Sequence, residues 1–220
     1  MVPLHVMNGI KNDQRVVDQI ENVTLLYSDL VNFTEFSNNS TPQEVVDMLS
    51  RIFSKFDQVC EQLDVYKVHT IGDCYVIMGY TGRLDKERRS MSVQIEEAHK
   101  VIQAGFDMCE IVNDERNNSD NKYIKKLDMR IGIHTGKIIG GIIGAKVVHY
   151  DIFGQDVLIT NKIESNGLGG RVCVSDTTYR LLAKDPRRFS CFEADPYKEI
   201  VVESLGMNLH THLLQMVLAS

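Results

Sequence analysis

The sequence has little of several features that would assign a protein to a class at once. Its cysteines are odd in number, widely spaced and without a Cys-x-x-Cys pair: Cys60, Cys74, Cys109, Cys173 and Cys191. Neither a disulfide framework nor a zinc site is therefore indicated, and a reducing, cytosolic setting fits best. The four prolines are scattered, and no repeat or low-complexity tract is present.

Long hydrophobic runs and an excess of positive charge are also missing. No run approaches the roughly 20 apolar residues of a membrane span, and the start, MVPLHVMNGIKNDQ, lacks the apolar segment of a signal peptide. The net charge of -6 disfavours a nonspecific nucleic-acid binder, because backbone phosphates require a basic field. We expect a cytoplasmic chain without a membrane span, and the alternative that it is the cytosolic part of a larger membrane protein stays open.

What is present suits one folded domain. The chain has 220 residues, 43% of them hydrophobic and 25% charged, which is enough to bury a sizeable core. We expect a lead-in over residues 1–21 and a single domain over residues 22–220.

Apolar patterning predicts the elements of the first half. A strand runs through NVTLL, and a loop then leads to a helix at Pro42, which Thr41 or Ser40 can cap. YKVHTIGDCYVIMGY predicts two strands around a tight Gly72-Asp73 turn. A second long helix is predicted over residues 90–113, followed by an exposed polar loop.

The second half continues this alternation. A strand pair is predicted over residues 127–154, a helix over 155–167, a short strand over 171–175 and a short helix over 176–182. The tail predicts three further strands, FSCFEA, KEIVVESL and LHTHLLQMV. The order predicts an α+β fold: a ferredoxin-like βαββαβ core, with helices packed on an antiparallel sheet, and a C-terminal strand extension.

Two aspartates stand where strands end. Asp29 follows the buried run NVTLL, and Asp73 lies at the junction of the predicted hairpin. A buried carboxylate requires a partner, such as a cation, a helix N-terminus or a metal. From the pattern alone, Asp29 is equally well interpreted as a strand-end cap, and Asp73 as an ordinary turn residue.

Four blocks narrow these alternatives. YSDLVNFTEFS, VHTIGDCYVIMG, MRIGIHTGKIIGGIIG and YDIFGQDVLITNKIES resemble, in order and approximate spacing, the catalytic domain of class III adenylate and guanylate cyclases. The resemblance covers residues 22–182 and implies the class III nucleotidyl cyclase fold. Such domains convert a purine nucleoside triphosphate into its 3′,5′-cyclic monophosphate and pyrophosphate, using two Mg2+ or Mn2+ ions in a dimeric site.

The resemblance implies roles for particular residues. Asp29 and Asp73 match the family's metal ligands, and Leu30 matches the position that lends a backbone carbonyl. Arg130 matches a basic residue that reaches the phosphates. The phosphate loop is expected to use backbone amides that follow the first strand, those of Val31, Asn32, Phe33 and Thr34.

The departures from the family pattern carry further information. Leu158 stands at the position of an asparagine, and Lys162 stands at the position of an arginine that stabilises charge on the reacting phosphate. Leucine donates no hydrogen bond, and lysine lacks the planar fork of arginine. VVESLGMN also lacks the paired lysines of a complementary half. We therefore expect the metal-binding, first-type half of a pair, with a homodimer left open.

The choice of base is less constrained. The family uses lysine and aspartate for adenine, and glutamate and cysteine for guanine, at positions held here by His69 and Asp151. Asp151 fits adenine and His69 fits neither, so ATP is slightly favoured over GTP. Asp151 is also open to an ordinary salt bridge with Lys146 or Lys162.

Two readings from other classes stay open. A catalytically silent nucleotide- or metal-binding module with a regulatory role would explain Leu158. A polymerase-like palm domain shares the two-metal chemistry and the topology, but the acidic charge and the IGIHTG block argue against it. His134 and His149 are interpreted as hydrogen-bonded strand histidines, because Mg2+ prefers oxygen ligands.

Overall fold

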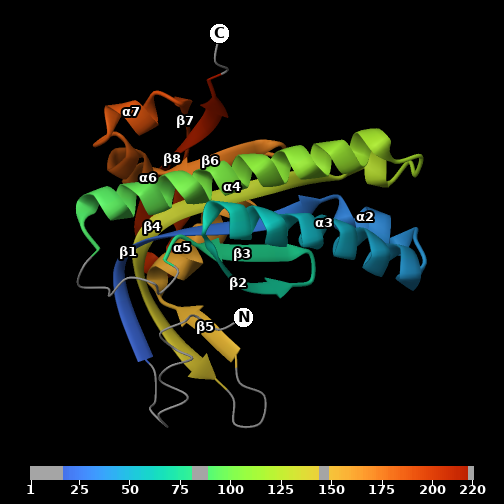
Figure 1. Ribbon diagram of the computed structural model, residues 1–220, viewed down its shortest axis with the longest axis horizontal. Coiled ribbons are helices and arrows are strands. Elements are labelled where there is room, and N and C mark those ends of the chain that lie inside the picture. Colours follow the sequence, from blue (N-terminus) through green and yellow to red (C-terminus); the bar gives the residue numbers. More distant parts are fainter. Residues whose placement is uncertain (1–16, 81–88, 144–148, 218–220) are drawn as a thin grey trace.

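A computed structural model of the chain describes residues 17–80, 89–143 and 149–217 (Figure 1). Its strands are β1 (Val17–Val31), β2 (Tyr66–Ile71), β3 (Cys74–Met78), β4 (Asp128–Ile143), β5 (His149–Phe153), β6 (Arg171–Ser175), β7 (Phe192–Val202) and β8 (Met207–Met216). Its α-helices are α2 (Phe33–Asn38), α3 (Pro42–Leu63), α4 (Met91–Asn118), α5 (Gln155–Ser165), α6 (Asp176–Leu182) and α7 (Pro186–Phe189). Two 3-10 turns complete the elements, η2 (Ile124–Lys126) and η3 (Glu203–Leu205).

The strands form a single sheet with the order β2-β3-β1-β4-β6-β8-β7, and β5 pairs with the far end of β4. The segment β2-β3-β1-β4 is antiparallel throughout and is the predicted ferredoxin-like core. The predicted fold class is confirmed, with one refinement. The extension joins the core through a parallel pair, β4 with β6, so the sheet as a whole is mixed.

The beginning of α3 shows why the sequence signal at Thr41 was reliable. The Thr41 hydroxyl accepts a hydrogen bond from the Glu44 backbone N–H at 3.3 Å, and the Glu44 carboxylate accepts one from the Thr41 N–H at 2.7 Å. This capping box satisfies donors that a helix start leaves unpaired. Pro42 occupies the first turn, where its missing N–H costs nothing.

The helix α4 is longer than predicted. It starts after its cap Ser90 as expected, but it continues to Asn118, through residues predicted as a loop. Arg51 of α3 donates to Glu115 with Nη2 and Oε1 2.6 Å apart, and Arg116 lies 3.5 Å from Asp128. These contacts with distant residues extend the helix past the end of its apolar pattern.

The sheet is covered on both faces. The helices α3 and α4 run side by side over one face (Figure 1) and pack against β1 through Leu26 and Leu30. The helix α5 contributes Ile159 and Ile163 to a separate cluster with residues of β6, β7 and β8. Since side chains alternate along a strand, Asp29 belongs with Leu25 and Tyr27 on the face away from α3 and α4.

Other departures from the sequence predictions lie near the ends of the chain. The strand β1 begins at Val17, so residues 17–21 of the expected lead-in form part of it, with an irregularity between Ile20 and Val23. The strand residues of FSCFEA and of KEIVVESL join in one strand, β7, because its pairing with β8 continues across a bulge between Pro196 and Glu199. The predicted strand was wrong at its start, because Phe189 ends α7 and β7 begins only at Phe192. Among the described helices, none combines the length and apolarity needed to cross a bilayer.

Candidate functional site

The structure brings Asp29 and Asp73 together. Asp29 lies near the end of β1, and Asp73 lies in the turn between β2 and β3, the expected hairpin. Pairing of β1 with β3 places Ser28 opposite Tyr75, and this register carries the two aspartates to the same end of the sheet. Their carboxyl groups are within hydrogen-bonding reach of each other.

The environment of Asp73 makes its negative charge costly. Burial first, and then the neighbouring charge of Asp29, raise the pKa of Asp73 from 3.8 to about 6. Hydrogen bonds from the backbone of Asp73 itself and of Leu30 oppose the increase. Two carboxylates that resist joint ionisation favour a cation between them, because it removes their mutual repulsion.

Arg130 joins this pair from the neighbouring strand. It lies directly opposite Asp29 in the β1–β4 register. Its Nη2 donates to the Asp29 Oδ2 at 3.0 Å, and its Nε donates to the Glu164 Oε1 at 2.6 Å. The predicted phosphate-binding residue is therefore held by two carboxylates, one from β1 and one from α5.

The cluster carries more negative than positive charge. Glu164 is buried, and burial raises its pKa while the hydrogen bond and charge of Arg130 lower it. The same negative charge affects Cys74. Burial first, and then the charge of Asp29, raise the pKa of its thiol to about 12. Three carboxylates stand against one guanidinium at this end of the sheet.

The donor set fits a hard divalent cation. Asp29 and Asp73 supply oxygen ligands, as Mg2+ and Mn2+ prefer. Within the described residues, no group of three or more histidine, cysteine, aspartate or glutamate side chains could hold a metal ion. The chain thus offers two carboxylates, and the remaining ligands of an ion would come from backbone oxygen, water or a bound phosphate.

The predicted phosphate loop lies beside these carboxylates. Asn32 adopts a left-handed conformation, with φ of 66°, and its side chain donates to the Lys126 carbonyl at 2.8 Å. This turn ends β1 and starts α2 at Phe33. Val31 and Phe33 are half-buried, whereas Asn32 and Thr34 are exposed.

His69 and Asp151 form a pair of their own. The His69 Nδ1 lies 3.0 Å from the Asp151 Oδ1, whereas the exposed His149 lies 3.9 Å from the other carboxylate oxygen. The alternative that Asp151 pairs with Lys162 is wrong, because Lys162 lies exposed on α5 and the ion pairs of Asp151 among described residues are with these histidines. Lys146 lies outside the described residues.

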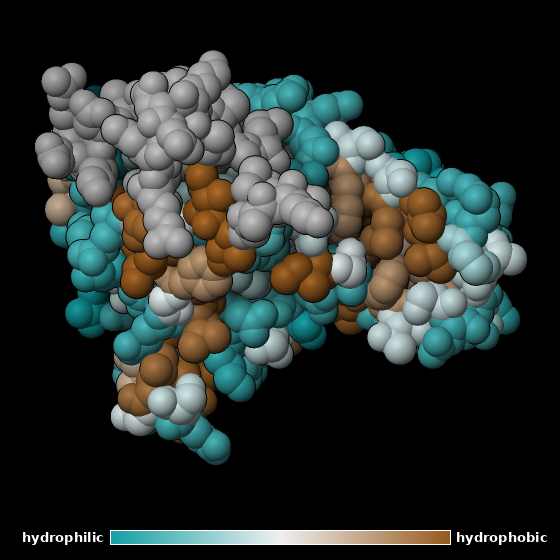
Figure 2. Space-filling view, turned by 90° about the horizontal axis from the view of Figure 1, so that it is seen from below, coloured by the Kyte–Doolittle hydropathy of each residue, from teal (hydrophilic) through white to brown (hydrophobic). Residues whose placement is uncertain are grey.

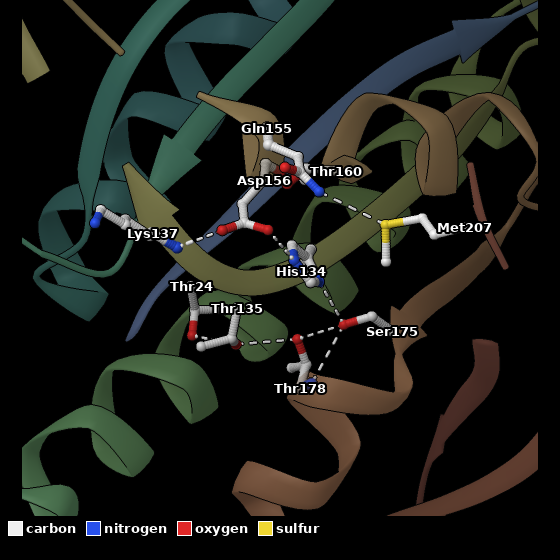
Figure 3. A network of polar contacts seen from close by, with 10 residues as sticks. All are labelled: Thr24, His134, Thr135, Lys137, Gln155, Asp156, Thr160, Ser175, Thr178 and Met207. Atoms are coloured by element: carbon white, nitrogen blue, oxygen red, sulfur yellow. Dashed lines mark hydrogen bonds and ion pairs between the residues drawn. The ribbon is translucent and has the colours of Figure 1, made fainter. Parts of the chain in front are cut away.

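The beginning of α5 is fixed by a partly buried polar network (Figure 3). The two ring nitrogens of His134 lie 2.8 Å from the Ser175 hydroxyl and 3.1 Å from the Asp156 carboxylate. Asp156 also accepts from the Lys137 backbone N–H at 2.6 Å. The interpretation of His134 as a hydrogen-bonded strand histidine is therefore confirmed.

The outer face of α5 carries the two departures from the family pattern. The side chain of Leu158 is 58% exposed, and Lys162 is exposed one turn later. Other apolar side chains reach the surface on the neighbouring strands, Ile139 on β4 and Phe153 on β5. Figure 2 shows apolar surface on the side of the molecule from which β5 projects.

Glu164 is the residue of this cluster that sequence reasoning missed. It stands in the quoted block YDIFGQDVLITNKIES, but a glutamate in a helix is usually a solvated surface residue. One signal was available: Glu164 follows Ile159 and Ile163 on the apolar side of α5, away from the exposed Leu158 and Lys162. A glutamate on a buried face requires a cation.

Sequence comparison places this chain among known cyclase domains. The family described as "Adenylate and Guanylate cyclase catalytic domain" matches residues 16–216. The chain is 35% identical to "Guanylyl cyclase, membrane" of Dictyostelium discoideum over 183 residues, 83% of this chain and 12% of that protein. It is 40% identical to "Guanylate cyclase soluble subunit alpha-1" of Canis lupus familiaris over 168 residues, 76% of this chain and 22% of that protein. The chain thus spans well under a third of these relatives.

Solved structures share the fold. The guanylate cyclase domain of RhGC from Catenaria anguillulae, determined in complex with GTP, superposes with a TM-score of 0.75 at 22% identity, covering 90% of this chain and 98% of that one. The adenylyl cyclase CyaB from P. aeruginosa gives 0.77 at 19% identity, covering 92% and 97%. The sequence match, the fold and the meeting of Asp29 with Asp73 lead to one conclusion: this chain belongs to the adenylate and guanylate cyclase catalytic domain family.

Proposed function

We propose that this chain is the metal-binding half of a purine nucleotidyl cyclase. In this reaction the ribose 3′-oxygen bonds to the α-phosphorus, the bond from that phosphorus to the pyrophosphate oxygen breaks, and the hydroxyl proton passes to base or solvent. The observation that carries the proposal is the contact of Asp29 with Asp73 beside Arg130. A domain extending from β1 through residue 220 would perform this role.

Asp29, Asp73 and the Leu30 carbonyl would hold two Mg2+ or Mn2+ ions. When bound, such ions lower the pKa of the attacking hydroxyl and offset the charge of the phosphates. The protein residues contribute by fixing the oxygens before the ions arrive. Asp29 and Leu30 are adjacent on a central strand, and Asp73 is held by backbone hydrogen bonds, one of them from Leu30.

Two groups of donors would hold the triphosphate. The backbone amides of Val31, Asn32, Phe33 and Thr34 lie where β1 turns into α2, directly after the metal-ligand candidates. Arg130 is fixed by Asp29 and Glu164, so its guanidinium is already positioned at the site. An arginine held in this way loses little conformational freedom when it binds a phosphate oxygen.

A complementary domain would supply the groups that this chain lacks. Leu158 cannot hydrogen-bond a substrate, and Lys162 lacks the fork of an arginine. Both are exposed on α5, and further apolar residues are exposed on β4 and β5. This surface suits a second cyclase domain, in a heterodimer, a pseudo-heterodimer or a homodimer.

For the base we propose GTP in the assembled enzyme, with ATP as the second candidate. The names of the sequence relatives favour guanylate cyclase activity. Asp151, an adenine-type residue, favours ATP, which the sequence alone slightly preferred. In this chain Asp151 pairs with His69, so the side chains at the two base-recognition positions contact each other. If this chain is the metal half, the base is selected mainly by its partner.

The test combines this chain with a cyclase domain that carries the missing asparagine and arginine. Cyclic product from GTP and from ATP is measured with Mn2+ for the mixture and for each component. We expect product only from the mixture, and its loss in Asp29→Ala. Asp47→Asn, which changes an exposed carboxylate of α3, serves as the matched control and should retain activity.

The same mixtures, examined by calorimetry as well as by product assay, distinguish a catalytically silent module from an enzyme. Calorimetry with Mn2+ and a nonhydrolysable GTP analogue would show binding in either case, whereas turnover is expected only from a catalytic half. Binding without product in every pairing would support the silent module. Full activity of the isolated chain would contradict its assignment as an incomplete half. A cytosolic location is proposed with this function, because its nucleotide substrates are cytosolic.

A further inference from the structure

We propose that Glu164 is a positioning residue for the metal and triphosphate site, acting through Arg130. Its carboxylate holds the guanidinium so that Asp29 can exchange Arg130 for a divalent cation while Arg130 stays in place for a phosphate. This inference rests on the proposed function, in which Glu164 only helps to hold Arg130, and it adds an effect of Glu164 on the binding of the cation.

The geometry of Arg130 makes such an exchange practicable. Glu164 holds the Nε, at 2.6 Å, and Asp29 holds the Nη2, at 3.0 Å. Because the two carboxylates use different nitrogens, one contact can break while the other persists. The contact that persists is the one to Glu164, whose side chain is 6% exposed, against 31% for Asp29. Solvent competes less with the buried pair.

Close backbone packing keeps Glu164 at this position. Gly132 of β4 faces α5, and a Cβ at that residue would lie 2.1 Å from the backbone nitrogen of Glu164. Arg130 and Gly132 are two residues apart on the strand and therefore share a face. The glycine lets the helix lie directly against β4, and Glu164 reaches the neighbouring Arg130 from a fixed backbone.

The opposite end of α5 is held by an independent pair. Asp156 bonds to His134 and to the Lys137 backbone, as Figure 3 shows. Asp156 and Glu164 lie on the same side of the helix, both facing β4. Loss of either carboxylate would loosen α5, but Glu164 alone contacts Arg130. A substitution of Asp156 therefore reports the effect of loosening α5, whereas a substitution of Glu164 also reports the loss of its contact with Arg130.

Removal of the charge on Glu164 should hinder the binding of a cation. Among the described residues, the acidic partners of Arg130 are Asp29 and Glu164. In Glu164→Gln the guanidinium of Arg130 keeps Asp29 as its charged partner. A metal ion that binds Asp29 must then displace the guanidinium completely. Residues that orient metal ligands typically change metal affinity by tenfold or more, so we expect Mn2+ binding to weaken by about tenfold.

The experiment measures Mn2+ binding to the purified full chain by electron paramagnetic resonance, with and without a nonhydrolysable GTP analogue. We expect about tenfold weaker binding in Glu164→Gln, and a change of less than about twofold in the control Asp156→Asn. In an Arg130→Gln background, Glu164→Gln should have little further effect. Thermal unfolding by circular dichroism verifies that each variant is folded.

Three results would overturn the proposal. Unchanged Mn2+ affinity in Glu164→Gln would show that Glu164 has no role at the site. An equal loss in Asp156→Asn would show that loosening of α5 is sufficient. If Glu164→Gln weakened Mn2+ binding just as much in the Arg130→Gln background, Glu164 would act on the metal directly through its charge and not through Arg130.

The outcome for the unmutated chain distinguishes this inference from the proposed function. Absence of Mn2+ and nucleotide binding by the unmutated chain would overturn both, whereas normal binding with unaffected Glu164→Gln overturns this inference alone. If Glu164→Gln does not fold, Glu164→Asp replaces it, because it keeps the charge and shortens the reach. We expect weaker Mn2+ binding there too, and unchanged affinity would again overturn the proposal.

Discussion

The pairing of Asp29 with Asp73 predicts that the metal-free domain becomes more stable when one of the two charges is removed. Asp73 is the better target because its pKa is raised from 3.8 to about 6. The folded domain therefore binds a proton on Asp73 more tightly than the unfolded chain does. As the pH rises from about 4 to above 6, the unfolded chain releases this proton first, and folding becomes less favourable.

The size of the effect follows from this difference in pKa. A difference of about two pH units corresponds to roughly 3 kcal/mol at 1.36 kcal/mol per unit. Because Asp73 is half-exposed, solvent screening reduces this figure, and about 1–2 kcal/mol is a reasonable expectation. Asp73→Asn should raise the unfolding free energy by that amount at pH 7.5, and by about half as much at pH 5.

Urea unfolding with EDTA at pH 7.5 and at pH 5 measures both values. Asp47→Asn is the control and should change stability by less than about 0.5 kcal/mol. Added Mn2+ should stabilise the unmutated chain and not Asp73→Asn. A less stable Asp73→Asn at pH 7.5, or a gain that is larger at pH 5, would refute the argument that charge repulsion acts on Asp73.

Three further predictions concern other parts of the chain. Gly132→Ala should cost about 2–3 kcal/mol of unfolding free energy in urea, because its methyl group would lie 2.1 Å from a backbone nitrogen of α5; an unchanged midpoint would contradict the close approach. Arg89→Met should cost about 3–5 kcal/mol, because it removes the buried guanidinium that pairs with the half-buried Glu97; a smaller cost in Arg89→Met with Glu97→Leu is the matched check. Leu158→Asn with Lys162→Arg should give the isolated chain measurable cyclase activity with Mn2+, and continued inactivity of a folded, dimeric double variant would show that these two residues are not what the chain lacks.

Local sequence signals predicted most of the elements. Thr41, Pro42 and Glu44 identify the start of α3 because a helix cap is formed by neighbours in the chain. Gly72 and Asp73 identify the hairpin because Gly72 adopts positive φ, here 61°. The order of these elements was enough to predict the ferredoxin-like core.

Local signals failed where distant contacts decide the structure. The last residues of α4 are polar, and their helical state depends on contacts such as that of Arg51 with Glu115. The sequence divided the tail into too many strands, and a proline such as Pro196 normally interrupts a strand. In the structure the pairing of β7 with β8 continues past it through a bulge.

The sequence by itself determined the βαββαβ order and the family, and it predicted the residue types of a metal and phosphate site. The roles of Asp29, Asp73 and Arg130 stay predictions. Only the tertiary structure decided which charged residues pair. Arg130 pairs with both Asp29 and Glu164, and His69 pairs with Asp151. The physical reason is that an ion pair requires atoms within a few ångströms, and these partners meet only after the sheet has formed and α5 has packed against β4.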